Sequence, residues 1–237
     1  MKYAFINEPV VKRNARIAQI TMLAGLAVLA GGMYVSFAMP EQFYLSIGAL
    51  LLGFALSQIG IYFSNRWGKR PRPYELLNES LKGLDSKYAL YHFYGPAQHL
   101  LVSPAGVWVL MPYAQRGRIT YEKGRWRQRG GNPYLKLFAQ EGLGRPDLEV
   151  GGEIEHVRKF LASEFPGEEI PVLAALVFTN KRAVVDVPEE AGAPAYTVTL
   201  DKLKDLVRKK SKERGISLEK AAQIREALLP QAKAAEA

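Results

Sequence analysis

Two long apolar runs near the start of the chain decide the fold that the sequence predicts. Residues 17–39 read IAQITMLAGLAVLAGGMYVSFAM, and residues 43–63 read FYLSIGALLLGFALSQIGIYF. The runs are about 23 and about 21 residues long, neither holds a charged side chain, and a helix of either length crosses the hydrocarbon core of a bilayer. The polar break between them (MPEQ, residues 39–42) is too short to be a domain. The sequence therefore predicts a transmembrane helical hairpin.

Basic residues flank both outer ends of this hairpin. Those before the first run are Lys12, Arg13 and Arg16, and those after the second run are Arg66, Lys69, Arg70 and Arg72. The connecting loop holds Glu41 and no basic residue. Because positively charged flanks stay inside, both termini are predicted to be cytoplasmic and Glu41 to lie outside, which corresponds to a multi-pass protein of the cell inner membrane.

Two alternatives compete with the membrane hairpin. A cleaved signal peptide is one, since Ser36-Phe37-Ala38 offers a small-x-small pattern, but the first run is long and a second run follows at once. A buried helical hairpin of a soluble protein is the other, and two consecutive uncharged runs of this length are rare in soluble cores.

Small residues at four-residue spacing predict close helix packing in the hairpin. The second run carries Ala49, Gly53 and Ser57, and the first carries Ala27 and Gly31, with Gly32 beside them. Such strips let helices approach closely, either within the hairpin or against a second copy in a homo-oligomer. A transport path would need ionisable side chains inside the spans, and neither run contains one.

The composition narrows the class of protein further. The chain has 237 residues, a formal net charge of +9 and no cysteine. The absence of cysteine excludes a disulfide framework, a thiol nucleophile and a Cys-ligated metal site. The positive charge favours anionic partners, namely nucleic acid or anionic lipid beside the anchor.

The residues after the hairpin predict an α/β domain of helices and short strands. Amphipathic or capped segments predict helices over residues 73–84, 132–140, 152–165, 201–212 and 217–229, with Ser217 as the N-cap of the last. Apolar and alternating segments predict strands over residues 88–94, 99–102, 107–111, 118–121, 125–128, 170–178 and 196–200.

The segment QHLLVSPAGVWVLMPY, residues 98–113, resembles the nuclease-related domain (NERD) family, a branch of the PD-(D/E)xK nuclease-like fold. In that family a helix with an acidic residue precedes an Asp-His strand, a Pro-x-Gly turn and a strand ending Glu-x-Lys. Here the His is His99 and the turn is Pro104-Ala105-Gly106. Further matches are Gly117-Arg118-Ile119, Gly124-Arg125-Trp126, Asn132-Pro133, Ile170-Pro171-Val172 and Val177-Phe178-Thr179-Asn180. The resemblance covers roughly residues 73–207 and implies a restriction-endonuclease-like mixed sheet.

The catalytic positions of the family are replaced in this chain. The resemblance places the strand Asp at Gln98, the Glu at Met111 and the Lys at Tyr113. Nucleases of this type hold Mg²⁺ through carboxylates, and neither an amide, a thioether nor a phenol replaces those ligands. Glu75 and Glu79 remain on the first helix. We therefore expect an inactive site with no catalytic residue, no metal ligand and no cofactor.

Relocation of the acidic residues is the alternative to an inactive site. Asp147, Glu149 or Glu153 would then fold back to replace the lost carboxylates. The three histidines, His92, His99 and His156, show no metal-ligand spacing, and His99 is expected to be a hydrogen-bonded strand residue. No glycine-rich phosphate loop occurs in the required strand-then-helix setting.

A basic stretch interleaved with aromatic residues is the candidate nucleic-acid-binding surface. Its members are Arg116, Arg118, Lys123, Arg125, Trp126, Arg127 and Arg129. Arginines attract phosphates and an exposed Trp126 would stack on bases, which together suit single-stranded nucleic acid. The alternatives are a solvated hairpin face, or an anion site on the basic helix of residues 201–212, which could lie on anionic lipid.

The whole sequence predicts a membrane-anchored cytoplasmic protein whose inactive nuclease-like domain acts in binding or scaffolding. The predicted parts are a cytoplasmic segment (1–16), a two-span hairpin (17–63), a basic linker (64–72), a nuclease-like α/β domain (73–214) and a C-terminal helix with a disordered tail (215–237). Two alternatives stay open: an active metal-dependent nuclease with relocated acids, and a structural membrane module that binds no nucleic acid.

Overall fold

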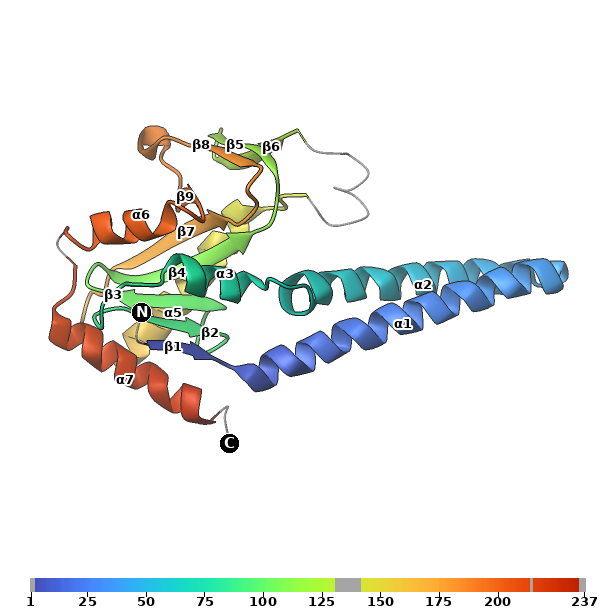
Figure 1. The fold of residues 1–237 in the computed structure, drawn as a ribbon, viewed down its shortest axis with the longest axis horizontal. Coiled ribbons are helices and arrows are strands. Elements are labelled where there is room, and N and C mark those ends of the chain that lie inside the picture. The colour runs from blue at the N-terminus through green and yellow to red at the C-terminus, as the bar shows by residue number, and fades with distance from the viewer. Residues whose placement is uncertain (1–2, 131–141, 214, 235–237) are drawn as a thin grey trace. The chain divides into compact units, whose positions relative to one another are not determined.

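The structure, a computed structural model, describes residues 3–130, 142–213 and 215–234 (Figure 1). The chain forms two compact units, and each is described by itself. One unit, the hairpin unit, is Pro9–Arg72. The other, the α/β unit, combines the residues before Pro9 with residues from Pro73 onward.

The hairpin unit consists of two long helices. Helix α1 (Glu8–Ala38) and helix α2 (Phe43–Phe63) are joined by a 3₁₀ turn, Pro40–Gln42, and a single π-helical turn, Ser64–Gly68, follows α2. Both helices are long and apolar enough to span a membrane, which agrees with the predicted hairpin. Only 11% and 17% of their most apolar windows are buried, whereas a core helix of a soluble protein is mostly buried.

Small residues line the contact between the two helices. The buried positions recur every seven residues, at Ala18, Gly25 and Gly32 on α1 and at Ser46, Gly53 and Gly60 on α2. Seven residues are about two helical turns, so each set lies on one face. A Cβ added at Gly32 would lie 2.6 Å from the Cβ of Ala49, so the helices approach this closely because a glycine is present.

The predicted small-residue strips differ in outcome. The strip on α2 is confirmed, since Gly53 is buried and Ala49 and Ser57 lie opposite the glycines of α1. On α1, Gly32 packs against Ala49, but packing of Ala27 and Gly31 within the hairpin was predicted wrongly, because both are exposed and a Cβ on Gly31 would meet nothing within 4 Å. The buried face of each helix is therefore marked by small residues seven positions apart rather than four positions apart. Association with a second copy stays a prediction.

The α/β unit contains four described helices and nine described strands. The helices are α3 (Pro73–Ser80), α5 (Pro146–Glu164), α6 (Leu203–Lys210) and α7 (Leu218–Ala234), with a 3₁₀ turn at Glu189–Ala191. The strands are β1 (Tyr3–Ile6), β2 (Ala89–His92), β3 (His99–Ser103), β4 (Gly106–Tyr113), β5 (Gly117–Glu122), β6 (Arg125–Arg129), β7 (Val172–Phe178), β8 (Ala183–Asp186) and β9 (Tyr196–Thr199).

The strands form two sheets, and the larger one is mixed. Its order is β1-β2-β3-β4-β7-β9, in which β2, β3 and β4 are antiparallel neighbours. The pairs β1–β2, β4–β7 and β7–β9 are parallel. The smaller sheet has the order β6-β5-β8, with β5–β6 antiparallel and β5–β8 parallel. The predicted α/β class with a mixed sheet is therefore confirmed.

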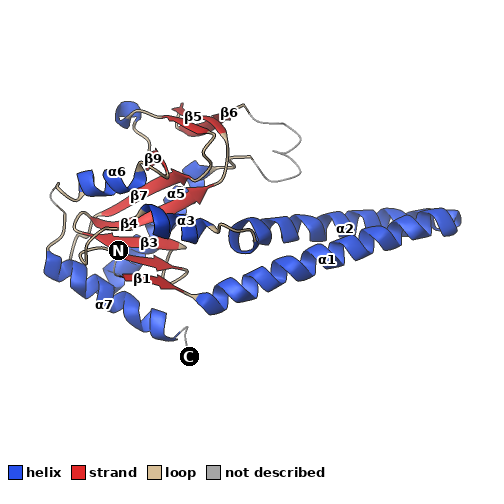
Figure 2. Ribbon diagram, in the orientation of Figure 1, coloured by secondary structure: helices blue, strands red, loops and turns tan. Residues whose placement is uncertain are grey.

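Helices cover both faces of the six-stranded sheet (Figure 2). One face packs against α5 and α7, where Val157, Leu161 and Ile224 are buried with the sheet residues Tyr91 and Leu176. The other face packs against α3 and α6, with Leu77 and Val207 fully buried. The continuous apolar run of β7 is explained by this arrangement, because a central strand is covered on both sides.

Most predicted elements are present, and the differences are two short strands that were not predicted and two helices that start earlier than predicted. Strands β1 and β8 were not predicted, and β1 pairs with β2 across more than eighty residues of chain. Helix α1 starts at Glu8 rather than at residue 17, and α5 starts at Pro146 rather than at residue 152. Ser217 is the predicted cap of α7, since its Oγ accepts the Lys220 N–H at 3.0 Å. The helix predicted over residues 132–140 lies outside the described residues.

Candidate functional site

The three positions that the resemblance assigns to catalysis lie together at one end of β3 and β4. In the antiparallel register Leu100 pairs with Val109, so Gln98, just before β3, lies toward the end of β4 that holds Met111 and Tyr113. Met111 and Tyr113 both contact the core on the α5 side of the sheet. The sequence order alone could not show that these positions face α5.

Two carboxylates of α5 lie beside these replaced positions. The Tyr113 hydroxyl donates a hydrogen bond to Glu149 Oε2 at 2.8 Å. The Gln98 backbone N–H donates to the Glu153 carboxylate. Glu149 and Glu153 are four residues apart, so they share one face of the helix. The third acid of the relocation alternative, Asp147, instead forms an exposed ion pair with Arg145 at 2.9 Å.

Glu153 also lines a shallow pocket of about 220 Å³. The other lining residues are Phe93, Gly95, Pro96, Ala97 and Gln98. Burial raises the pKa of the Glu153 carboxyl above its ordinary value, which His156 and the Gln98 N–H oppose and the Glu149 charge reinforces. Phe93 adopts a left-handed backbone, φ 62°, which is strained for a non-glycine residue and often marks a functional loop.

Glu149 and Glu153 supply two carboxylates beside the replaced positions, which is fewer than a Mg²⁺ site made of protein ligands alone needs. Mg²⁺ takes six oxygen ligands in an octahedron, and one of these two carboxylates already accepts the Tyr113 hydroxyl. Within residues 3–130, 142–213 and 215–234, no group of three or more His, Asp or Glu side chains is placed to hold a metal ion.

The histidines His92 and His99 form a buried pair on the opposite face of the sheet. Their Nδ1 atoms are 2.9 Å apart, and His92 Nε2 lies 3.2 Å from Asn78 Oδ1 on α3. Burial lowers the pKa of His99 to about 3 and that of His92 well below its ordinary value. His99 is thus a hydrogen-bonded strand residue, as predicted.

The basic stretch forms a hairpin in the small sheet. Strands β5 and β6 are joined by Lys123-Gly124, and both residues have positive φ, 52° and 74°, as a two-residue type I′ turn requires. Arg118 pairs with Arg129, and Thr120 pairs with Arg127. Glu122 pairs with Arg125, and these three pairs lie on the same face of the small sheet. We call this exposed surface the arginine face, and its members are Arg118, Arg125, Arg127 and Arg129 with Thr120, Glu122, Val184 and Asp186.

Trp126 corrects one part of the predicted surface. Side chains alternate along a strand, so Trp126 points away from Arg125 and Arg127. Its side chain is only 5% exposed, lies in the main core and donates from Nε1 to Thr197 Oγ1 at 2.9 Å. The ring is therefore unavailable for stacking on a base, and the stacking role predicted for Trp126 is wrong.

Acidic residues neutralise part of the arginine face. Arg118 pairs with Asp186 at 3.1 Å, and Arg129 pairs with Glu122 at 3.2 Å. Arg125 and Arg127 are exposed and make no ion pair within the described residues. Arg125 also interacts electrostatically with Asp147, and both guanidinium groups are exposed to solvent. Lys123 is exposed at the tip, and Arg116 is half-buried just before β5.

The structure adds two cations that the sequence did not point to. Lys181 and Arg182 are exposed in the turn before β8, and the Arg182 carbonyl accepts the Gly117 N–H at 3.1 Å. This bond places the turn beside the start of β5. The parallel pairing of β8 with β5 brings them there, and no local pattern around residue 181 indicates that pairing.

The basic helix of residues 201–212 has no free apolar face. In α6, Leu203 and Val207 are fully buried against the sheet. Lys209 and Lys210 pair with Glu189 and Glu213 at 3.0 and 2.8 Å. The apolar side of this helix therefore belongs to the core, and contact of its exposed basic side chains with anionic lipid stays a prediction.

The membrane-flanking residues lie on the hairpin unit as predicted from their sequence positions. Lys12, Arg13 and Arg16 are exposed on α1. The Arg66 guanidinium lies 4.0 Å from the centre of the Tyr62 ring, and Arg72 Nε donates to the Trp67 carbonyl at 2.9 Å.

Comparisons with protein-family models, with curated proteins and with solved structures found no match for this chain.

Proposed function

We propose that the protein is a membrane-anchored, polyanion-binding protein whose nuclease-like domain holds nucleic acid near the membrane without cutting it. The arginine face carries this proposal. It presents four exposed arginines against two acidic residues, with Lys123 at its tip and Lys181 and Arg182 at its edge. Burial of Trp126 removes base stacking, so recognition rests on phosphate contacts and is independent of sequence and strandedness.

The resemblance to the nuclease-related domain family supports the identity of the ligand. The order of α3, β3, the Pro-Ala-Gly turn and β4 agrees with the order of that family's motif, and β2 is an additional strand between α3 and β3. Gln98, which replaces its Asp, directly precedes β3, and Met111, which replaces its Glu, lies near the adjacent end of β4. These features support a restriction-endonuclease-like domain as the finer fold assignment.

One observation favours the active nuclease as a second candidate. Glu149 and Glu153 lie next to Tyr113 and Gln98, where the family needs its charged residues. Magnesium ions in nucleases are often completed by substrate phosphates, which could add ligands to a pair of carboxylates. The absence of a third acidic ligand among the described residues keeps binding without cleavage as the first candidate.

The exposed apolar side chains of the hairpin support anchoring in a membrane, and the basic flanks support a cytoplasmic location for both termini. The chain contains no cysteine, so a single Gln42→Cys substitution gives an unambiguous label. In whole cells a membrane-impermeant maleimide should label Cys at position 42, and a Cys at Ala237 should react only after the inner face is opened. The reverse pattern would refute this topology.

A salt titration tests the binding proposal. Purified full-length protein in neutral detergent is titrated with fluorescent duplex DNA, single-stranded DNA and RNA between 50 and 200 mM salt. Changing Arg125 and Arg127 to Gln should weaken binding to all three and flatten the slope of log K against log salt by about two. The matched control is Lys202→Gln with Lys212→Gln, which removes two exposed charges at the ends of α6 and should leave the slope unchanged.

Two outcomes of the same assay would replace the proposal. Metal-dependent cleavage that disappears with Glu153→Gln would show that the protein is an active nuclease. Failure of the unaltered protein to bind any of the three nucleic acids at 50 mM salt would favour the structural membrane module.

A further inference from the structure

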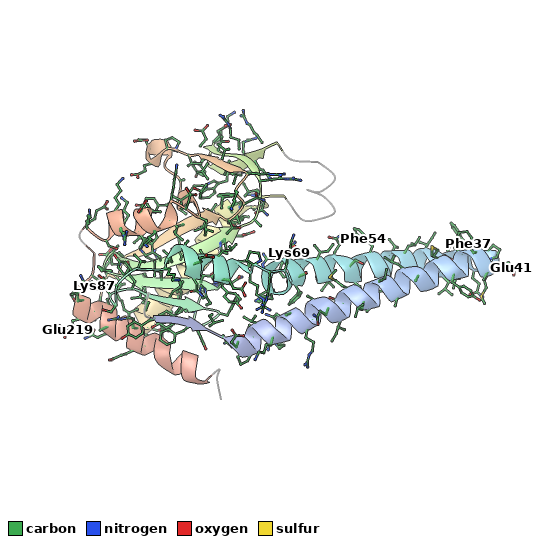
Figure 3. The ribbon with its side chains drawn as sticks, viewed as in Figure 1. Phe37, Glu41, Phe54, Lys69, Lys87 and Glu219 are labelled. Atoms are coloured by element: carbon green, nitrogen blue, oxygen red, sulfur yellow. The ribbon has the colours of Figure 1, made fainter. Side chains whose placement is uncertain are left out.

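Charge is separated along the hairpin unit. Between Pro9 and Arg72 the only acidic residue is Glu41, in the turn that joins the two helices. All seven basic residues of the same stretch lie toward the other end, and we call them the basic collar: Lys12, Arg13, Arg16, Arg66, Lys69, Arg70 and Arg72. Figure 3 shows Phe37 and Glu41 at one end of the hairpin and Lys69 at the other.

Helix packing brings the two halves of the collar to one level. A Cβ added at Gly60 would lie 3.2 Å from Thr21 Oγ1, and one added at Gly68 would lie 4.0 Å from the Ala18 Cβ. The residues before Ala18 and those after Gly60 therefore lie at the same end of the antiparallel pair. Cations that are about fifty residues apart in the sequence form one surface there.

The collar borders the apolar surface directly. Ile20 and Leu23 on α1 are 57% and 68% exposed, and Ile59 on α2 is 45% exposed. Between this apolar surface and the collar lies Tyr62, with the Arg66 guanidinium over its ring. An aromatic ring beside a cation at the edge of an apolar band is the arrangement of a membrane–water interface.

Most collar cations have no ion-pair partner among the residues that the structure describes. Lys12, Arg13, Arg16, Lys69 and Arg70 are exposed and make no ion pair within the described residues. Another member, Arg66, is partly immobilised on the Tyr62 ring, so it loses less side-chain freedom when it binds an anion. The collar is thus a partly preorganised anion surface at the level of phospholipid headgroups.

We propose that the basic collar binds anionic phospholipid headgroups and selects lipids such as phosphatidylglycerol over zwitterionic ones. The ligand chemistry is a phosphodiester that carries a net negative charge and is attached to acyl chains that cover the neighbouring apolar side chains. Each Lys or Arg near an anionic surface contributes roughly fivefold in affinity. The basic collar and the arginine face share no residue, so lipid binding and nucleic-acid binding can be tested with different variants.

Lipid retention by the full-length protein tests this proposal. The protein is purified in neutral detergent, where insertion topology has no influence, and mixed with equal amounts of phosphatidylglycerol and phosphatidylcholine. Bound lipids are counted by native mass spectrometry. We expect phosphatidylglycerol to be retained at least about tenfold more, and the triple change R66Q/K69Q/R70Q to lower this preference to about twofold or less.

Two controls separate charge from packing and the collar from the arginine face. The charge-retaining change R66K/R70K should keep the preference, which also shows whether loss in the triple variant reflects charge rather than misfolding. The matched triple change R125Q/R127Q/R129Q should weaken nucleic-acid binding, flatten its salt slope by about two to three, and leave the lipid preference intact. Failure of the polyanion proposal is thus visible in a different variant and assay.

Three results would overturn the inference. Equal retention of the two lipids by the unaltered protein would show no selection. Loss of selection in the arginine-face variant would place the site in the α/β unit. Complete competition by millimolar glycerol phosphate would indicate a site for a soluble phosphate, because a lipid held also by its acyl chains should resist that competitor.

Discussion

The two units of this protein place their hydrophobic side chains in opposite ways. In the hairpin unit the large side chains point outward, as at Leu23 and Phe37, and glycines lie inside. In the α/β unit the large side chains, such as Trp108 and Leu101, are fully buried, and arginines lie outside. Apolar side chains gain free energy by leaving water, which explains the buried core of the α/β unit. If the hairpin is surrounded by hydrocarbon, burying a large apolar side chain between its helices gains little, and close packing of the two backbones holds the helices together instead.

Truncation of a leucine in each unit should give the largest difference in the free energy of unfolding between the two units. Leu101→Ala should lower the free energy of unfolding by about 2–5 kcal/mol, because Leu101 is fully buried and its removal leaves a cavity in the sheet core. Leu23→Ala should change it by less than about 0.5 kcal/mol, since Leu23 is 68% exposed. Denaturant unfolding of the full-length protein in detergent, followed by tryptophan fluorescence, measures both. Similar losses for the two variants would remove the contrast.

Acid should weaken the α/β unit through its histidine pair. The pKa of His99 falls to about 3 on folding and that of His92 falls well below its ordinary value, so between about pH 6.5 and pH 3 the unfolded chain binds more protons. Stability is therefore complete above about pH 6.5 and decreases as the pH falls, by roughly 1.4 kcal/mol per pH unit for each histidine.

Unfolding of the full-length protein at pH 7.0, 6.0 and 5.0 measures this decrease. The variant H92Q/H99Q keeps polar side chains but cannot titrate in this window, and it should flatten the pH dependence. An unchanged pH dependence in that variant would assign acid sensitivity to other groups.

Glycine substitutions test the packing of the hairpin unit with a matched pair. Gly25→Leu should destabilise the helix pair by about 1–3 kcal/mol, because an added Cβ would lie 2.8 Å from Ser57 Oγ and 3.1 Å from the Gly53 carbonyl oxygen. Gly31→Leu should have little effect, since a Cβ there meets nothing within 4 Å. Both add the same side chain to the same helix, so resistance to SDS-induced unfolding compares them directly. Equal sensitivity would mean that another face of α1 makes the contact.

The predictability of the fold differed between local and long-range features. The hairpin and most strands could be predicted, because runs without charge and short β-branched segments between turns are local signals. Strand β1 has only four residues, and its strand character comes from pairing with β2 far along the chain. The start of α5 carried a usable signal, Pro146 at the first helical position with Asp147 in the first turn, but Gly151 and Gly152 weakened the helical pattern.

The candidate site shows the same division. The alternation in RWRQR already places Trp126 on the opposite face from Arg125 and Arg127, so its burial could have been predicted from strand geometry. The contacts of Glu149 and Glu153 could not, because they depend on where α5 crosses the sheet. The pairing of β8 with β5, which adds Asp186 to the arginine face, was equally hidden.

The smallest expected change in stability tests whether Asp186 limits the arginine face. Asp186 forms an exposed ion pair with Arg118, so Asp186→Asn should alter the free energy of unfolding by less than about 1 kcal/mol. It should nevertheless strengthen nucleic-acid binding several-fold and steepen the salt slope by about one, because Arg118 becomes available for one more phosphate. Asp201→Asn is the matched control, since it makes the same charge change at an exposed position before α6. If both variants strengthen binding equally, net charge rather than the arginine face governs affinity, and if neither does, Arg118 takes no part in recognition.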